Sequence, residues 1–210
     1  MKQRIPRIKI CGLTREADVD AAVAAGADAI GFVFYPHSPR YVTPEQAAVL
    51  VRRLPPFVSA VGLFVNAAPD FVETVLARVP LNILQFHGDE DEAAFRRYHR
   101  PYLKAARVTP ELDLVQYASR FSSAQGLLLD AFVEGYGGGG KTFDWTLIPS
   151  GLNCPIVLSG GLDAANVGDA VRRVRPAAVD VSSGVEAAKG IKDPAKIEAF
   201  VAAVRAAQGD

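Results

Sequence analysis

The sequence alternates eight times between a short apolar segment and a longer segment with apolar residues on one helical face. The predicted strands are residues 7–11, 29–34, 60–65, 82–86, 102–106, 126–130, 156–159 and 178–182. Strands that alternate with helices pair in parallel, and strands that are apolar throughout are covered on both faces. Eight such units can close into a (β/α)₈ barrel, the TIM-barrel architecture. We therefore expect an α/β fold with a single barrel domain over residues 1–210.

The helical patterns support this alternation, most clearly at the end of the chain. Asp193 and Pro194 predict an N-cap and a first-turn proline. Apolar residues follow them at helical spacing, namely Ile197, Phe200, Val201 and Val204. The helix after the seventh strand is expected to open near Asp163. The alternative fold is a doubly wound open sheet, which the absence of a Gly-x-Gly-x-x-Gly turn after the first strand disfavours.

The composition favours a small-molecule ligand and a reducing compartment. Lysine plus arginine and aspartate plus glutamate number 23 each, so net charge supplies no reason to bind nucleic acid or an acidic membrane. Two cysteines, Cys11 and Cys154, are too few for a disulfide framework. Neither a signal peptide nor an apolar run of membrane-spanning length is evident. We expect a cytoplasmic monomer or homodimer with no nucleic-acid or membrane partner.

Polar residues at the carboxyl ends of the strands are the candidates for chemistry, because the active site of such a barrel lies there. Lys9 and Cys11 end the first strand, and alternation places both on its inner face, with Cys11 nearer the mouth. A lysine close to a thiol favours the thiolate, which can act as a base or nucleophile. The other interpretation of Cys11 is a small buried hydrophobe, and Cys154 is expected to be inert.

Two carboxylates belong to the same predicted site. Asp130 ends the sixth strand at the mouth, where it can serve as a general acid or, alternatively, as a helix cap or ion-pair partner. Asp180 lies inside the eighth strand, which barrel closure places beside the first. We expect Asp180 to border the substrate and chiefly to neutralise Lys9, which would weaken the pull of Lys9 on the Cys11 pKa.

Three more side chains are predicted to contact substrate. Gln85 and His87 point the same way at the end of the fourth strand, where His87 is expected to hydrogen-bond substrate or, alternatively, to pack internally. Arg40 follows a proline-stiffened turn after the second strand. Its guanidinium suits a planar carboxylate, and a solvated surface arginine is the alternative.

Two glycine-bearing loops follow the seventh and eighth strands, which are neighbours in the barrel. The first contains Gly160 and Gly161, and the second contains Ser182, Ser183 and Gly184. Loops in these two positions can direct backbone N–H groups and a helix N-terminus at one phosphate. The sequence therefore predicts a phosphorylated small molecule as the ligand.

A further glycine run, residues 135–142, fits the P-loop pattern Gly-x₄-Gly-Lys-Thr. A P-loop requires a strand that leads into the glycines and a helix that starts at Lys-Thr. Here residues 131–134 intervene before the glycines, and Pro149 interrupts the segment after Lys-Thr. We interpret the stretch as a mobile loop that closes over the ligand, with nucleotide binding as the minor alternative.

Together, these segments resemble the phosphoribosylanthranilate isomerases, enzymes of tryptophan biosynthesis. The matching stretches run in order along almost the whole chain: residues 9–14, 31–40, 82–88 and 129–130, the glycine loop through residue 145, then 159–162 and 180–186. The resemblance implies a (β/α)₈ barrel. It also implies an Amadori rearrangement that turns N-(5-phosphoribosyl)anthranilate into 1-(2-carboxyphenylamino)-1-deoxy-D-ribulose 5-phosphate.

Position by position, the resemblance implies that Cys11 is the general base and Asp130 the general acid. Arg40 matches the arginine that meets the anthranilate carboxylate, and the paired glycine loops match the phosphate site. Because the iminium ion formed on ring opening is the electron sink, no metal and no cofactor is expected. One departure is Gly139, where the family often has a hydroxyl residue, and this leaves a hydroxyl contact from the glycine loop in doubt.

Two other functions remain compatible with parts of the sequence. A ribulose-phosphate epimerase or an isomerase of the histidine pathway would keep the barrel, but such relatives commonly use carboxylates or metal-binding histidines. A non-catalytic binder of phosphorylated ligands or nucleotides belongs to another class. It would bind its ligand unchanged after Cys11→Ala or Asp130→Asn.

Overall fold

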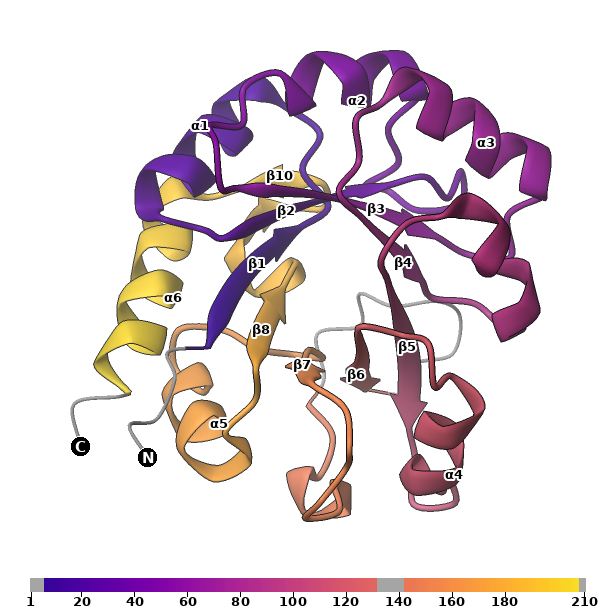
Figure 1. Cartoon of the computed structure of the whole chain (residues 1–210). Coiled ribbons are helices and arrows are strands. Elements are labelled where there is room, and N and C mark those ends of the chain that lie inside the picture. Colours follow the sequence, from indigo (N-terminus) through magenta and orange to yellow (C-terminus); the bar gives the residue numbers. More distant parts are fainter. Residues whose placement is uncertain (1–5, 132–141, 208–210) are drawn as a thin grey trace.

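Eight parallel strands form a closed barrel in the computed structural model, which describes residues 6–131 and 142–207 (Figure 1). The strands are β1 (Arg7–Cys11), β2 (Ala29–Val33), β3 (Ser59–Phe64), β4 (Ile83–Phe86), β5 (Tyr102–Val108), β6 (Gly126–Ala131), β7 (Ile156–Leu158) and β8 (Ala178–Val181). Each pairs with its neighbours in chain order, and β1 pairs with β8 to close the ring. The predicted (β/α)₈ barrel is confirmed.

Both faces of the strands are buried, but by different partners. Leu127 and Leu129 of β6 belong to the large core between strands and helices. Leu128 belongs to a small separate cluster with Ala105 and Val157. Because successive side chains of a strand point to opposite faces, Asp130 lies on the same, inner face as Leu128. The same alternation around Ile10, an outer-core residue, turns Lys9 and Cys11 inward.

Helices surround the barrel in most of the connections (Figure 1). They are α1 (Glu16–Ala25), α2 (Pro44–Val51), α3 (Pro69–Arg78), α4 (Leu114–Arg120), α5 (Val167–Val174) and α6 (Pro194–Ala206). The β4–β5 connection holds two 3₁₀ turns, η1 (Glu92–Ala94) and η2 (Arg96–Tyr98), and the described part of the β6–β7 connection holds η3 (Trp145–Leu147). The described residues of these two connections therefore form 3₁₀ turns where the strand–helix alternation predicts a helix.

The helix α5 begins at Val167, later than the predicted start near Asp163. The side chain of Asp163 accepts hydrogen bonds from the N–H groups of Ala165 and Asn166, at 2.9 and 3.0 Å. These are the donors that a helix N-cap accepts, and the N–H group of Val167 donates to the Asp163 carbonyl at 3.0 Å, so Asp163 caps one turn that leads into α5.

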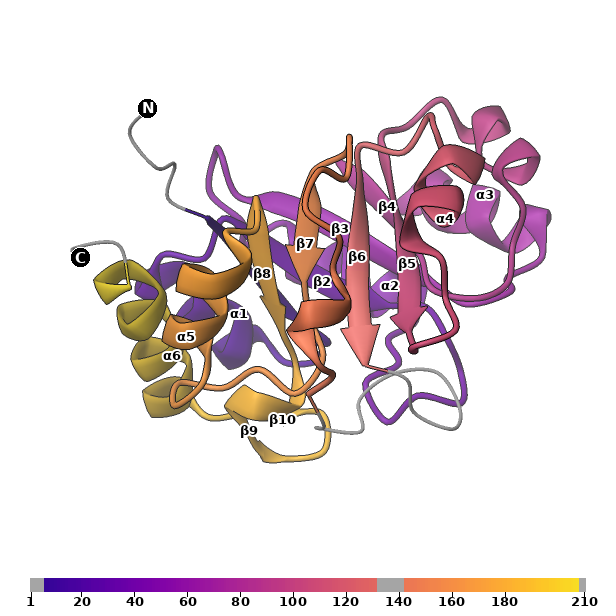
Figure 2. The same ribbon diagram turned by 90° about the horizontal axis from the view of Figure 1, so that it is seen from below.

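The carboxyl ends of the strands carry an additional hairpin, formed by β9 (Glu186–Ala188) and β10 (Ile191–Lys192) after the 3₁₀ turn η4 (Ser183–Val185). Figure 2 shows this hairpin beyond the arrowhead of β8. Within the described residues, no helix has the length and apolarity needed to cross a bilayer.

The cap of α6 gives a direct test of the local structure. Asp193 accepts hydrogen bonds from the N–H groups of Ala195 and Lys196, at 2.9 and 3.3 Å. We expect Asp193→Ala to lower the free energy of unfolding by about 1 kcal/mol, because two N–H groups lose their acceptor. Urea unfolding measures this loss. The control Glu198→Ala, at an exposed position of the same helix, should change stability by less than about 0.5 kcal/mol, and equal effects of the two changes would contradict the cap.

Candidate active site

A buried ion pair joins the two strands that close the barrel. Lys9 of β1 and Asp180 of β8 are register partners, and Lys9 Nζ lies 2.7 Å from Asp180 Oδ1. Their side chains are only 5% and 6% exposed. Asp180 Oδ2 also accepts a hydrogen bond from Ser159 Oγ, at 3.2 Å. Asp180 therefore neutralises Lys9, as barrel closure predicts.

Cys11 lies one step further along β1, at the inner edge of the mouth. Burial raises the pKa of the Cys11 thiol, and the nearby Lys9 ammonium opposes this only in part, while Asp180 adds to the rise. Burial alone would lower the pKa of Lys9, but the Asp180 carboxylate outweighs it, so Lys9 stays charged. The resting side chain of Cys11 is consequently a thiol at neutral pH, as expected when Asp180 compensates the charge of Lys9.

The neighbouring strand is shaped to admit the sulfur atom. Gly31 of β2 is the register partner of Cys11, and a Cβ atom on Gly31 would lie 2.6 Å from Cys11 Sγ. Real Cβ atoms do not approach so closely, so any larger residue at position 31 would displace the thiol. The absence of a side chain on Gly31 therefore leaves the space that the sulfur atom of Cys11 occupies.

Asp130 ends β6 on the inner face and is in contact with β4. Its Oδ1 accepts a hydrogen bond from the N–H group of Ala131 at 2.9 Å, and its Oδ2 lies 3.1 Å from His87 Nε2. The second contact is close but lacks the direction of a hydrogen bond. Asp130 and His87 thus form one buried acidic–imidazole pair.

The predicted substrate residues of β4 lie one behind the other. His87 Nδ1 is 3.1 Å from Gln85 Nε2, and the Gln85 side chain is fully buried. The amide of Gln85 therefore contacts the ring that contacts Asp130. A direct contact of Gln85 or His87 with substrate stays a prediction.

Arg40 is held by a glutamate to which the sequence patterns give no role. Its Nε and Nη2 donate to Oε1 and Oε2 of Glu186, at 2.7 and 2.8 Å. Lys192 Nζ donates to the same Oε1 at 2.9 Å. Burial opposes the charge of Glu186, but the hydrogen bonds from Arg40 and Lys192 keep the pKa of its carboxyl below the ordinary value.

The two glycine-bearing loops touch each other, as their positions predict. A Cβ atom on Gly184 would collide with the carbonyl oxygen of Leu162, which follows Gly160 and Gly161. Among the described residues, the N–H groups of Gly160, Gly161 and Gly184 have no hydrogen-bond acceptor. Ser182 Oγ donates to the carbonyl of Cys11 at 3.0 Å, which ties the second loop to β1. The loops thus leave backbone donors free beside the predicted base.

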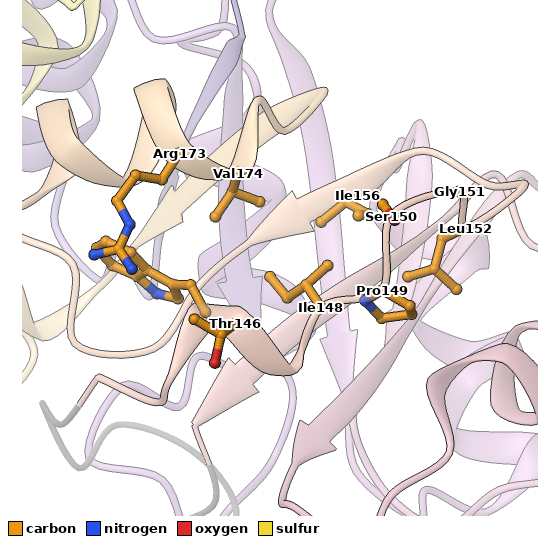
Figure 3. Close-up of a pocket in the computed structure, with 10 residues that line it drawn as sticks. Thr146, Ile148, Pro149, Ser150, Gly151, Leu152, Ile156, Arg173 and Val174 are labelled. Atoms are coloured by element: carbon orange, nitrogen blue, oxygen red, sulfur yellow. The ribbon is translucent and has the colours of Figure 1, made fainter.

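Two cavities lie away from these residues. One, of about 360 Å³, lies outside the barrel between η3, the following loop and α5, where Figure 3 shows Ile148 and Pro149 opposite Arg173 and Val174. The other, of about 520 Å³, is lined by the first residues of several strands, at the amino-terminal end of the barrel. Neither cavity is lined by Cys11, Asp130 or Arg40.

The glycine run that fits the P-loop pattern, with the predicted mobile loop and Gly139, lies outside the described residues apart from Thr142.

Within the part of the chain that is described, no group of three or more His, Cys, Asp or Glu side chains is arranged to hold a metal ion.

Comparisons with known proteins point to one family. The family model described as N-(5'phosphoribosyl)anthranilate (PRA) isomerase matches residues 8–203. The N-(5'-phosphoribosyl)anthranilate isomerase of Dechloromonas aromatica (strain RCB) is 72% identical over 201 residues, which cover 96% of this chain and 97% of that protein.

Solved structures agree with this match. The crystal structure of phosphoribosyl anthranilate isomerase from Thermotoga maritima has a TM-score of 0.86 and 44% identity, covering 96% of this chain and 99% of that chain. A phosphoribosyl anthranilate isomerase in complex with reduced 1-(o-carboxyphenylamino)-1-deoxyribulose 5-phosphate has a TM-score of 0.80 and 39% identity, with the same coverage of 96% and 99%.

The Lys9–Asp180 pair generates a prediction about stability. We expect Lys9→Met and Asp180→Asn each to lower the free energy of unfolding by about 3–5 kcal/mol, because each leaves one charge buried without its partner. The double variant Lys9→Met/Asp180→Asn should lose less than the two single losses added together. Urea unfolding of the four proteins gives this coupling energy.

The matched control is the exposed pair Arg78–Glu45, whose side chains are 55% and 65% exposed. Breaking it with Arg78→Met should cost less than about 1 kcal/mol, since water screens an exposed pair. Losses that simply add in the Lys9–Asp180 cycle would show that the two charges do not stabilise each other.

Proposed function

The chain belongs to the N-(5'-phosphoribosyl)anthranilate isomerase family, and on that premise we propose which side chains carry its reaction. It is an isomerase of tryptophan biosynthesis. We propose that Asp130 and Cys11 are the general acid and general base that convert N-(5-phosphoribosyl)anthranilate into 1-(2-carboxyphenylamino)-1-deoxy-D-ribulose 5-phosphate. The match over residues 8–203 carries this proposal, because it contains every side chain involved.

The first step opens the sugar ring. Asp130 donates a proton to the furanose ring oxygen, the bond from that oxygen to C1 breaks, and the nitrogen lone pair forms the C1–N double bond of an iminium ion. The place of Asp130 at the end of β6, on the inner face at the mouth, supports this role, because a positioned carboxyl group there can reach the substrate. The N–H group of Ala131 binds Oδ1, which leaves Oδ2 as the oxygen that carries the proton.

The second step removes a proton from carbon. The Cys11 thiolate takes the proton from C2, and the electron pair of the C–H bond moves toward the iminium nitrogen to give an enol-amine, which tautomerises to the ketone. The iminium ion accepts the electrons, so this route uses no metal or coenzyme. The pKa of Cys11 is raised, and the base is therefore a minor form of the resting enzyme at neutral pH.

Arg40 is proposed to bind the anthranilate carboxylate. Glu186 occupies Nε and one hydrogen of Nη2, and among the described residues Nη1 has no acceptor. A guanidinium presents its donors in a fixed plane, so Nη1 and the second hydrogen of Nη2 form a fork that matches a carboxylate. Binding there would position the reacting carbons between Asp130 and Cys11.

The paired loops are proposed to bind the phosphate. The free N–H groups of Gly160, Gly161 and Gly184 are the kind of donors that anions bind.

The predicted cofactor-free route, the predicted cytoplasmic location and the choice between monomer and homodimer stay predictions. Both cysteines are free thiols, which suits a reducing compartment.

Loss of either proposed proton-transfer group should abolish most turnover. We expect Cys11→Ala and Asp130→Asn each to lower kcat by roughly 10²–10⁴, the usual contribution of one positioned acid or base. The decrease in phosphoribosylanthranilate fluorescence measures turnover directly. Cys154→Ala is the matched control and should keep wild-type rates, because Cys154 lies before β7 at the amino-terminal end of the barrel. Wild-type turnover in Cys11→Ala would exclude Cys11 as the base.

The raised pKa of Cys11 predicts that its thiolate forms only at alkaline pH. The fraction of Cys11 present as thiolate should rise with pH toward a pKa above the ordinary 9.0, because burial disfavours the charged form. Absorbance of the thiolate near 240 nm, taken as the difference between wild type and Cys11→Ala, reports that pKa without involving Asp130. A thiolate that forms below about pH 8 would contradict the proposed ionisation.

A further inference from the structure

A compact group of three buried charges lies beside the proposed base, formed by Arg40, Glu186 and Lys192 and called here the hairpin charge cluster. Its side chains are 11%, 6% and 0% exposed. Burial of three charges is costly unless each is paired and hydrogen-bonded. None of the three is needed for the proton transfers assigned to Asp130 and Cys11.

The Glu186 carboxylate accepts hydrogen bonds from four donors. Oε1 accepts from Arg40 Nε at 2.7 Å, Lys192 Nζ at 2.9 Å and the N–H group of Gly190 at 3.3 Å. Oε2 accepts from Arg40 Nη2 at 2.8 Å. The two parallel bonds fix both the position and the plane of the guanidinium.

The packing around Arg40 fixes its side chain further. A Cβ atom on Gly12 would lie 2.5 Å from Arg40 Cδ, so the side chain runs directly over the residue that follows Cys11. The remaining edge of the guanidinium, with Nη1, is the one left for a ligand. Glu186 thus selects which edge of Arg40 a substrate carboxylate meets.

The charge balance of the cluster favours one further anion. Arg40 and Lys192 are cations and Glu186 is an anion, which leaves a net charge of plus one. A substrate carboxylate bound to Arg40 brings the sum to zero. Without Lys192 the pair Arg40–Glu186 would already be neutral, and an incoming carboxylate would approach the negative Glu186 without compensation.

Lys192 also connects the cluster to the proposed phosphate loop. Its Nζ donates to the carbonyl oxygen of Ser182 at 3.0 Å. The ammonium therefore bridges Glu186 and the loop that precedes η4. Lys192 thus links Glu186, which holds the proposed carboxylate-binding arginine, to the proposed phosphate-binding loop.

We propose that Glu186 and Lys192 are the positioning residues that make Arg40 selective for a substrate bearing a carboxylate on its aromatic ring. Glu186 orients the free edge of the guanidinium, and Lys192 supplies the positive charge that a second carboxylate requires. This inference rests on the proposed contact between Arg40 and the anthranilate carboxylate.

The test compares two ligands. One is reduced 1-(o-carboxyphenylamino)-1-deoxyribulose 5-phosphate, and the other is the same compound without the ring carboxylate. The ratio of their dissociation constants, measured by isothermal titration calorimetry, is the carboxylate preference. Binding of the ligand without the carboxylate depends on correct folding and on the phosphate contacts. A variant that only damages the structure therefore weakens the binding of both ligands alike.

We expect Lys192→Met to lower the carboxylate preference about tenfold or more, the effect of removing one buried compensating charge. Glu186→Asp keeps the charge but withdraws the carboxylate, so it should also lower the preference. Lys189→Met removes the same charge from an exposed position of the same hairpin and should change the preference by less than about twofold.

The decisive variant is Lys192→Arg, which keeps the net charge of plus one and leaves Glu186 in place. It should keep a large part of the preference that Lys192→Met loses, whereas a role of the lysine in packing alone predicts that Lys192→Met, which has a similar volume, keeps the preference. An unchanged preference in both Lys192→Met and Glu186→Asp, or an equal loss in Lys192→Arg and Lys192→Met, overturns this inference.

Arg40→Met separates this inference from the function on which it rests. If Arg40→Met keeps the carboxylate preference, the proposed contact of Arg40 with substrate is wrong, and the inference falls with it. If Arg40→Met loses the preference while Lys192→Met and Glu186→Asp keep it, only the roles of Glu186 and Lys192 are refuted.

Discussion

The ion pair between Lys9 and Asp180 is the interaction on which the rest of the site depends. It lies at the seam where β1 meets β8, and the two residues are register partners across that seam. A buried ammonium or carboxylate without a partner would cost several kcal/mol, so the pair favours the one register in which both charges meet. Closure in that register places Cys11 at the mouth and brings Ser182 to the end of β1.

The same pair limits the chemistry of its neighbour. A lysine next to a cysteine suggests an easily formed thiolate, but the Lys9 ammonium is already bound to Asp180, and burial keeps the pKa of Cys11 raised. The site therefore combines a stable closed seam with a base that is mostly protonated at rest. The Lys9 ammonium stabilises the contact between β1 and β8, and it is also the charge that favours the thiolate form of Cys11.

Other polar side chains at the mouth are also paired. Asp130 lies against His87, and Glu186 accepts hydrogen bonds from both Arg40 and Lys192. The contacts Asp130–His87 and Arg40–Glu186 each join side chains from different barrel units. Buried polar contacts thus line the mouth of the barrel. A substrate binds there through the hydrogen-bond donors that these contacts leave free.

Local patterns in the sequence were sufficient for the barrel itself. Eight apolar strands with helices between them admit few other topologies, and the strand ends differ from the predicted ones by at most two residues. The patterns were less reliable for connections, because a turn capped by Asp163 precedes α5, and residues 92–94 and 96–98 form 3₁₀ turns instead of a helix. Positions at strand ends also predicted that Cys11, Asp130 and the glycine loops lie at the mouth, since alternation and strand polarity are local properties.

Tertiary structure alone showed that Glu186 meets Arg40, whereas the contact of Lys9 with Asp180 was predicted from closure of the barrel. Arg40 and Glu186 are 146 residues apart, and Lys9 and Asp180 are 171 apart. Glu186 and Lys192 occupy a short hairpin that has no periodic pattern, so nothing local indicates that they face Arg40. The sequence determined the fold and the chemical types present at the mouth through the period of its apolar residues. The pairing of charges, and with it the pKa of Cys11, depended on closure, because Coulomb energy and desolvation depend on distance in space and not on separation along the chain.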